Sequence, residues 1–306
     1  MPHTELLESA LTLFTEKYIF PDKAATAAED VRARMATGEF DDLDEETLSQ
    51  RITGLLDEHC GDKHLRLRPS ESTSTRAGAA SRADVEESWN ARCVRTNHGV
   101  HRVERLSGNV GYIDLRLITS PSVGAGAIAA AMNLVANTNA LIFDCRGNRG
   151  GDPLGVQLWH SYLFPDADTH LNDIYSGDTG RTRQYWTLAH VDGQRYTGKP
   201  VWVLTGDATF SAGEEFSYNL KALERATLVG ETTRGGAHPT EVFPLTPTME
   251  VTIPIARSIN PVTGTNWEGT GVEPDVAVPA TEAFDTAYRA ALEHVSGLET
   301  HPAIHT

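Results

Sequence analysis

The 306-residue chain has 40% hydrophobic and 22% charged residues, values typical of a soluble globular protein with one large core or two domains. Its formal net charge of −16 opposes binding to nucleic acid or to an anionic membrane, so we expect neither as a partner. The N-terminal residues lack the basic and apolar regions of a secretory signal, and no apolar run approaches the roughly 18–20 residues of a membrane span.

The three cysteines are scattered along the chain, at Cys60, Cys93 and Cys145. They have no metal-ligand spacing and are odd in number, which indicates buried thiols in a reducing compartment. We therefore expect a cytoplasmic protein with no metal and no cofactor. The oligomeric state cannot be inferred from these features.

The first 60 residues read as three short amphipathic helices. Thr4 is a candidate N-cap of the first helix, Pro21 lies near the start of the second, and the second ends at Gly38. The apolar stripe of the third helix ends at Gly61. These helices predict a small helical N-terminal domain over residues 1–68.

Residues 69–98 are rich in Ser, Thr, Arg and Ala and predict a polar linker or mobile loop. From residue 99 to 306 strand and helix patterns alternate. Two strands flank the Ser-Gly-Asn turn at 107–109, and "ALIFD", "VWVLT" and "ATLVG" are continuous apolar strands separated by helical segments. This order predicts a parallel or mixed α/β core, in which loops after the carboxyl ends of strands hold the ligand.

Two such loops carry candidate functional residues. "DCRGNRGG" follows one buried strand, and its Gly150 and Gly151 allow close approach of the backbone and can aim amides at an anion. "TFSAGEE" follows the next strand and places Ser211 at a helix N-terminus. Ser211 fits a helix cap, with Glu214 at the N3 position, and it also fits a nucleophile; the local pattern favours the cap.

A nucleophile needs a base, and twelve histidines are candidates. His64 lies where a helix gives way to a strand, and His238 follows a glycine-rich turn, where a surface position is at least as plausible as a site. Glu268 lies in a turn-rich loop, where it could be solvated or could orient a histidine. Spacing alone does not choose among them.

Six segments together resemble the S41 peptidase superfamily, which includes tail-specific (C-terminal processing) proteases, the tricorn core protease and interphotoreceptor retinoid-binding protein modules. They are "GDKHLRL", "GNVGYIDLR", "LIFDCRGNRGG", "VLTGDATFSAGEEF", "LVGETTRGGAHP" and "NWEGTGVEPDVAV", in the family's order over residues 61–278.

The resemblance implies a crotonase-like ββα core and serine-based acyl transfer. By its match to the family's Ser-Ala element, Ser211 would be the nucleophile. The amides of Ala212 and Gly151 would form the oxyanion hole. Gly150 and His238 would line the substrate pocket.

The resemblance also bears on the base. Tail-specific proteases carry a lysine in the turn that here reads "TTRGGAHP", and Gly236 occupies that position. Arg234 cannot replace it, because a guanidinium stays protonated, and Lys221 lies within the predicted serine helix. The tricorn-like pattern instead implies His64 as base and Glu268 as its partner, with Lys63 replacing a serine of that pattern.

The segment before the core is too short and polar for a PDZ domain, which weakens a tail-specific role. The chain resembles the retinoid-binding-protein-like branch most, notably at "GETTRGGAHP". We therefore expect a serine hydrolase with a Ser-His-Glu triad acting on a peptide or small acyl substrate. Two alternatives stay open: a non-proteolytic module that binds an apolar small molecule, and a family member that catalyses another biosynthetic reaction.

Overall fold

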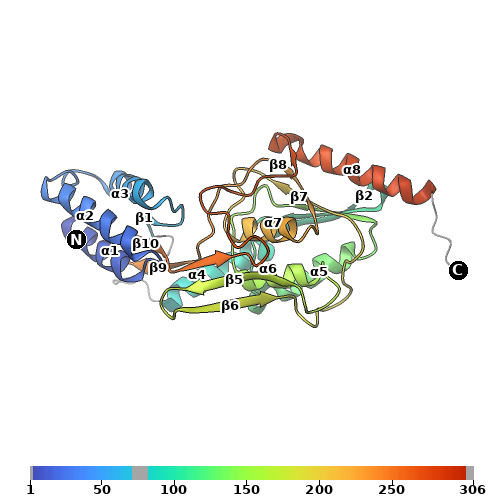
Figure 1. The fold of residues 1–306 in the computed structure, drawn as a ribbon, viewed down its shortest axis with the longest axis horizontal. Coiled ribbons are helices and arrows are strands. Elements are labelled where there is room, and N and C mark those ends of the chain that lie inside the picture. The colour runs from blue at the N-terminus through green and yellow to red at the C-terminus, as the bar shows by residue number, and fades with distance from the viewer. Residues whose placement is uncertain (1–2, 71–81, 301–306) are drawn as a thin grey trace. The chain divides into compact units, whose positions relative to one another are not determined.

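A computed structural model describes residues 3–70 and 82–300 (Figure 1). The described residues divide into two compact units. The first comprises those within 1–91, 174–183 and 238–259, and the second those within 92–173, 184–237 and 260–306. The domain boundaries drawn from the sequence remain a prediction.

Three helices open the first unit: α1 (His3–Lys17), α2 (Pro21–Ala36) and α3 (Glu45–Cys60), as the sequence predicts. The expected cap at Thr4 is wrong, since α1 already begins at His3. Pro21 begins α2, where its missing N–H costs no hydrogen bond. Gly61 ends α3 in the left-handed conformation, with a φ of 63°.

The helices of the first unit pack against an antiparallel sheet of order β1-β10-β9. Its strands are β1 (Arg66–Pro69), β9 (Thr240–Pro244) and β10 (Met249–Pro254). The buried apolar side chains of the helices and of β10 form one core, which includes Phe14, Phe40, Leu48, Leu55, Met249 and Val251. This unit is therefore mixed in structure, where the sequence indicated only helices.

The segment expected to be a linker contains a helix, α4 (Arg82–Arg95). The expectation of a loop over residues 69–98 is thus wrong for this part. Its Ala, Glu and Arg residues are good helix formers, and the neighbouring Ser and Thr residues obscured that signal. Residues 71–81, the rest of the expected mobile segment, lie outside the described residues.

A six-stranded sheet of order β12-β8-β7-β4-β3-β2 forms the second unit. Its strands are β2 (Val100–Leu106), β3 (Val110–Leu115), β4 (Ala140–Asp144), β7 (Val201–Thr205), β8 (Thr227–Gly230) and β12 (Val276–Ala277). All neighbours pair in parallel except β2 and β3, which form the predicted hairpin around the short 3-10 helix η2 (Ser107–Asn109). The predicted mixed α/β core is confirmed.

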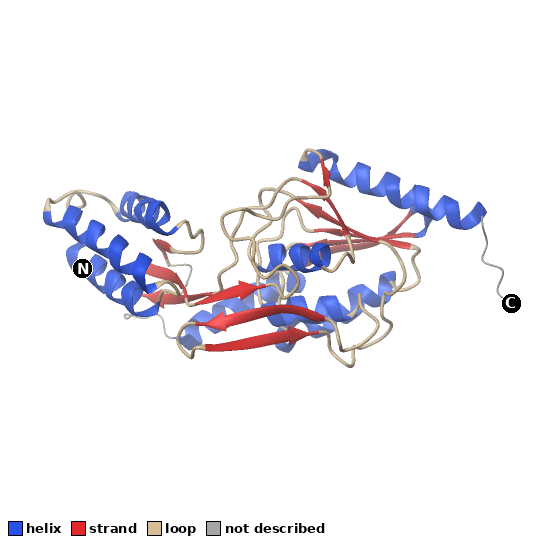
Figure 2. Ribbon diagram, viewed as in Figure 1, coloured by secondary structure: helices blue, strands red, loops and turns tan. Residues whose placement is uncertain are grey.

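Alternate residues of these strands enter two different cores, because successive side chains of a strand point to opposite faces. Ile113, Phe143 and Val203 face the core that contains residues of α5 (Pro121–Val135), α6 (Pro153–Ser161) and α7 (Ala212–Ala222). Tyr112, Ile142 and Trp202 face small residues of α8 (Ala280–Thr300). The sheet is thus the middle of three layers, with α8 alone along one face (Figure 2).

The remaining elements are a 3-10 helix, η1 (Asn97–Gly99), and a sheet of order β11-β5-β6. Its strands are β5 (His170–Ser176), β6 (Arg181–Trp186) and β11 (Ala256–Ile259). Strands β5 and β6 each pass from one unit into the other along the chain.

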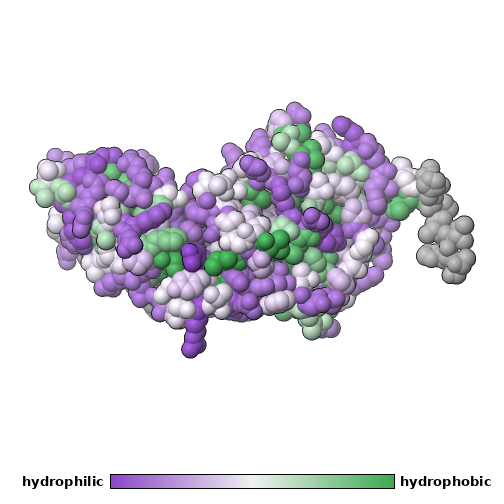
Figure 3. All heavy atoms as spheres, viewed as in Figure 1, coloured by the Kyte–Doolittle hydropathy of each residue, from purple (hydrophilic) through white to green (hydrophobic). Residues whose placement is uncertain are grey.

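None of the described helices is long and apolar enough to cross a membrane. On the faces shown in Figure 3, hydrophobic residues form only small patches among hydrophilic ones.

Candidate active site

The glycine loop after β4 and the serine loop after β7 lie together in the second unit. Since β4 and β7 are parallel neighbours, their carboxyl ends reach the same edge of the sheet. Two hydrogen bonds join the loops: the Phe210 amide donates to the Asn148 carbonyl at 3.0 Å, and the Thr209 hydroxyl donates to the Cys145 carbonyl at 2.8 Å. The sequence prediction that both loops lie at a ligand-binding edge agrees with this arrangement.

Ser211 is half-buried and occupies the N-cap position of α7 with an unusual backbone. Its φ of 54° and ψ of −124° fall where a non-glycine residue is strained. The predicted capping box is present, with Ser211 as the N-cap and Glu214 at the N3 position, and the amides of Glu214 and Glu215 also donate to the Ser211 carbonyl at 2.8 and 2.9 Å. Capping alone does not require this strain, whereas a sharp strand-to-helix turn can expose a nucleophilic hydroxyl.

Gly150 makes the approach of the two loops possible. A Cβ added to Gly150 would lie 2.7 Å from the Ser211 Cβ and 3.2 Å from the Ala212 nitrogen, and its φ is +102°. Gly151, with a φ of +146°, is equally constrained, because an added Cβ would lie 1.8 Å from the Ile118 carbonyl oxygen. Both positions therefore require glycine.

Two amides in this region remain available as donors. Gly151 pairs in parallel with Ile118, whose amide bonds the Gly150 carbonyl and whose carbonyl accepts from Asp152. In such a ladder the Gly151 amide points away from Ile118. Within the described parts of the chain, neither this amide nor that of Ala212, the first residue of α7, has a hydrogen-bond acceptor. The dipole of α7 adds positive potential beside Ser211.

The buried Glu214 carboxylate links Ser211 to the turn at residues 233–236. One oxygen accepts from the amides of Ser211 and Gly236, both at 2.9 Å. The other accepts from the Thr233 hydroxyl and the Gly235 amide, both at 2.5 Å. Burial raises the pKa of Glu214, and these hydrogen bonds oppose that rise. Of these bonds, the sequence predicts only the one between Glu214 and its own N-cap, because the other donors lie about 20 residues further along the chain.

The same turn also contacts the loop that carries Glu268. The Trp267 indole donates to the Gly236 carbonyl at 2.7 Å, and the Glu268 carboxylate accepts from the Ala237 amide. The Thr233 hydroxyl, in turn, accepts from the Val272 amide at 2.7 Å. Within the second unit, then, hydrogen bonds connect the Ser211 loop through Glu214 to the Glu268 loop.

The two candidate histidines belong to the first unit. The amide of His64 donates to Asp62 at 3.1 Å, and its carbonyl accepts from the Thr252 hydroxyl. His238 is 5% exposed, so it is not a surface residue, and its Nδ1 lies 2.7 Å from the Asp62 carboxylate. Asp62 and His238 lie 176 positions apart in the chain, so nothing in the sequence indicated their pairing.

Lys221 does not serve this site. It is an exposed residue of α7 whose ammonium pairs with Asp275 at 3.1 Å and with the Glu273 carbonyl. Arg234 stacks over the Phe210 ring at 5.2 Å. Tail-specific proteases carry their lysine in the turn that corresponds to residues 233–236. In this chain the turn instead donates the main-chain amides of Gly235 and Gly236 to Glu214.

The α7 helix carries a second buried acid beside Glu214. Burial raises the pKa of Glu215 to about 8, and the charge of Asp152 reinforces this effect. Burial also lowers the pKa of His160 on α6 to about 3, so this histidine is neutral at physiological pH. Its Nε2 lies 3.2 Å from the Phe216 carbonyl. The sequence singled out neither residue, since His160 was only one of twelve candidate histidines.

The chain is similar to known proteins in sequence and in fold. The model of Peptidase family S41 matches residues 109–278. Carboxyl-terminal-processing peptidase 2 of Arabidopsis thaliana chloroplasts is 29% identical over 178 residues, 56% of this chain and 32% of that protein. The carboxyl-terminal-processing protease of Synechocystis is 27% identical over 63% of this chain and 45% of that protein. The chain thus spans a third to a half of the length of these curated relatives.

Among solved structures, a candidate peptidase from Parabacteroides merdae has a TM-score of 0.64 at 20% identity, over 96% of this chain and 97% of that chain. The tricorn protease has a TM-score of 0.58 at 15% identity, over 96% of this chain and 37% of that chain. A lipoprotein from Streptococcus agalactiae has a TM-score of 0.57 at 13% identity, over 94% and 96%. At these identities the similarity concerns the fold.

Proposed function

The chain belongs to peptidase family S41, and we propose that it is a serine peptidase in which Ser211 is the nucleophile. The observation that carries this proposal is the strained, half-buried Ser211 at the N-terminus of α7, packed against Gly150 and next to two unpaired amides. A helix cap would account for the position of Ser211 but not for the glycine loop that approaches it.

The proposed reaction is acyl transfer from a peptide. The Ser211 hydroxyl attacks the scissile carbonyl while a base takes its proton, and the carbonyl oxygen gains negative charge. The amides of Ala212 and Gly151 donate to that oxygen, where each donor is worth about 10²–10³ in rate. The base then returns the proton to the leaving amine, and water releases the acyl group by the same steps.

We further propose His64 as the base and Glu268 as the carboxylate that orients it. Gly236 at the family's lysine position supports a histidine base, since that turn offers no amine. His64 belongs to the first unit and Glu268 to the second. A histidine base predicts that kcat/KM falls as the pH drops below neutrality.

For the substrate we propose peptides, because the two curated relatives are carboxyl-terminal processing enzymes. The cytoplasm remains our proposal for the location. All three cysteines are free and buried, as expected in a reducing compartment.

The test is labelling by a serine-directed phosphonate together with cleavage of a peptide library. Labelling of the native chain that disappears in Ser211→Ala, and that slows in His64→Ala, is the expected result. Ser217→Ala serves as the control, because Ser217 is a buried serine of α7 whose hydroxyl bonds the Gly213 carbonyl. Peptide cleavage that persists in Ser211→Ala would overturn the proposal. It would also be overturned if the native chain is not labelled by the phosphonate and instead binds an apolar ligand saturably.

A further inference from the structure

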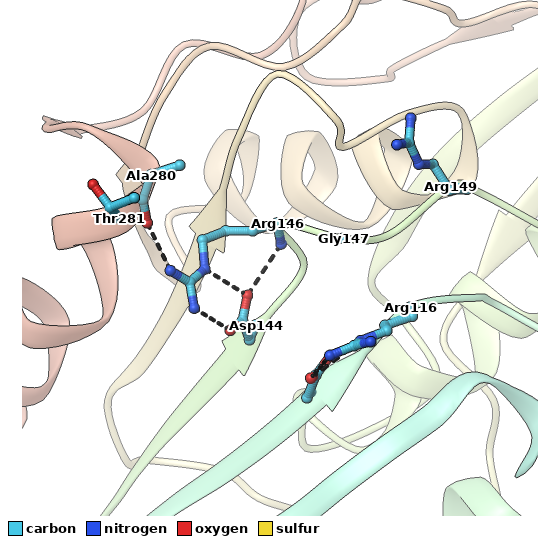
Figure 4. Close-up of a pocket in the computed structure, with 8 residues that line it drawn as sticks. Arg116, Asp144, Arg146, Gly147, Arg149, Ala280 and Thr281 are labelled. Atoms are coloured by element: carbon cyan, nitrogen blue, oxygen red, sulfur yellow. Dashed lines mark hydrogen bonds and ion pairs between the residues drawn. The ribbon is translucent and has the colours of Figure 1, made fainter. Parts of the chain in front are cut away.

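A second concave site lies at the carboxyl ends of β3 and β4, with a volume of about 420 Å³ (Figure 4). It is lined by side chains that follow these strands and by the first turn of α8, including Arg116, Arg146, Arg149 and Thr281. Ser211, Gly150, Gly151 and Ala212 do not line it. Its position is nevertheless the edge at which α/β sheets bind ligands.

Two of the three arginines are neutralised by aspartates of the same wall. The Arg146 guanidinium holds the Asp144 carboxylate at 2.9 and 2.6 Å, and Arg116 holds Asp114 at 3.0 and 2.8 Å. Burial alone would raise the pKa of Asp144, but the bonds from Arg146 and Tyr112 hold it below its ordinary value. The Arg146–Asp144 pair therefore remains charged and balanced at neutral pH.

Arg149 gives the pocket an unbalanced positive charge. Its side chain is exposed, and it has no carboxylate or other partner within the described parts of the chain. In Figure 4 it extends from the loop beyond Gly147, apart from the two Arg–Asp pairs. A local excess of positive charge stands out in a chain whose net charge is −16.

The polar groups that remain unused around this pocket are mainly donors. Arg116 bonds Asp114 through Nε and Nη2, so its Nη1 has no acceptor among the residues described. Arg149 offers all five of its N–H groups. The first turn of the 21-residue helix α8, at Thr281, adds positive partial charge from the helix dipole. Two carboxylates reduce this contribution: Glu231, which accepts from the Ala280 amide at 3.0 Å, and Glu282 in the first turn of α8.

We propose that this pocket binds the phosphate group of a small phosphorylated molecule. A carboxylate presents two oxygens in one plane, which a single guanidinium satisfies. A phosphate presents at least three oxygens in different directions and carries up to two charges, which suits donors from Arg149, Arg116 and a helix N-terminus. The volume is within the range of small-molecule sites, about 300–1,000 Å³, and leaves room for the rest of the ligand. The proposal is independent of the role of Ser211.

The experiment is a calorimetric titration of the full chain with inorganic phosphate and with ribose 5-phosphate at low ionic strength. Two variants each remove one exposed guanidinium: Arg149→Met in the pocket and Arg289→Met, on the exposed face of α8, as the matched control. Loss of one charge-assisted donor group weakens binding by about 10–100-fold. We expect this loss in Arg149→Met and an unchanged affinity in Arg289→Met.

The two ligands separate the sources of the phosphate. Tighter binding of the ester indicates an organic phosphate, and equal binding indicates the free ion; both support the site. Acetate at the same ionic strength tests the class of anion. The proposal is overturned if no titration saturates at millimolar ligand, if acetate binds as tightly as phosphate, or if both arginine variants lose affinity equally.

Discussion

Replacing Glu214 by glutamine tests how far the geometry at Ser211 depends on one buried carboxylate. In the native chain its two oxygens accept four hydrogen bonds, from Ser211, Thr233, Gly235 and Gly236. Glutamine keeps the size of the side chain but exchanges one accepting oxygen for an NH₂ donor. Two of the four groups that donate to Glu214 would then face the NH₂ group of the glutamine, which is also a donor.

The structure indicates which orientation costs less. If the NH₂ faced Ser211 and Gly236, two main-chain amides would lose their acceptor. If it faces Thr233 and Gly235, the Thr233 hydroxyl can rotate and accept, and only the Gly235 amide is left unpaired. One buried unpaired amide costs about 1–3 kcal/mol, and removal of a buried charge offsets part of this loss. We therefore expect Glu214→Gln to be about 2 kcal/mol less stable, and Glu214→Ala to be less stable still.

The assay is urea unfolding of the native chain, Glu214→Gln and Glu214→Ala, with phosphonate labelling measured in parallel. Glu293→Gln is the matched control, since Glu293 is exposed on α8. Because the Ser211 amide binds Glu214 directly, we expect labelling to slow by about 10–100-fold, the effect of a small misplacement of a reacting group. If Glu214→Gln and Glu293→Gln show the same stability and labelling rate, the carboxylate does not hold this site.

Three further outcomes are expected. Gly150→Ala places a methyl group 2.7 Å from the Ser211 Cβ at a φ of +102°, so it should abolish labelling, and normal labelling would contradict the close packing. The control is Gly126→Ala in α5, where the added methyl meets open space. This variant should be more stable than the native chain by about 0.5–1 kcal/mol. Glu215 has a pKa raised from 4.5 to about 8, so its native state retains a proton that the unfolded chain loses. The free energy of unfolding should therefore fall between pH 4.5 and about 8, by on the order of 5 kcal/mol, and Glu215→Gln should remove this slope; an unchanged slope in urea titrations would count against the buried acid. Trp267→Phe should cost about 1–3 kcal/mol in thermal unfolding, because the Gly236 carbonyl loses its indole donor, and an unaltered Tm would refute that assignment.

Local patterns predicted most of the regular structure. The apolar stripes, Pro21 and Gly61 indicated the N-terminal helices within a few residues, and the continuous apolar strands indicated the buried parallel sheet. The strands β5, β6 and β9 to β12 and the helix α8 were not recognised. Strand β10 is buried throughout and lies in an antiparallel sheet with β1, more than 180 residues earlier. The alternating Met249, Val251 and Ile253 are themselves a strand signal, but the distant partner β1 cannot be identified from local sequence.

The sequence by itself determined which loops meet: a serine and a pair of glycines follow neighbouring strands, which parallel pairing must bring to one edge of a sheet. Only the tertiary structure decided how these residues are held. The strained backbone of Ser211, the carboxylate of Glu214 shared by two loops, and the unbalanced Arg149 beside two Arg–Asp pairs depend on groups far apart in the chain. Hydrogen bonding and charge balance act over a few ångströms in space, so sequence spacing does not report them.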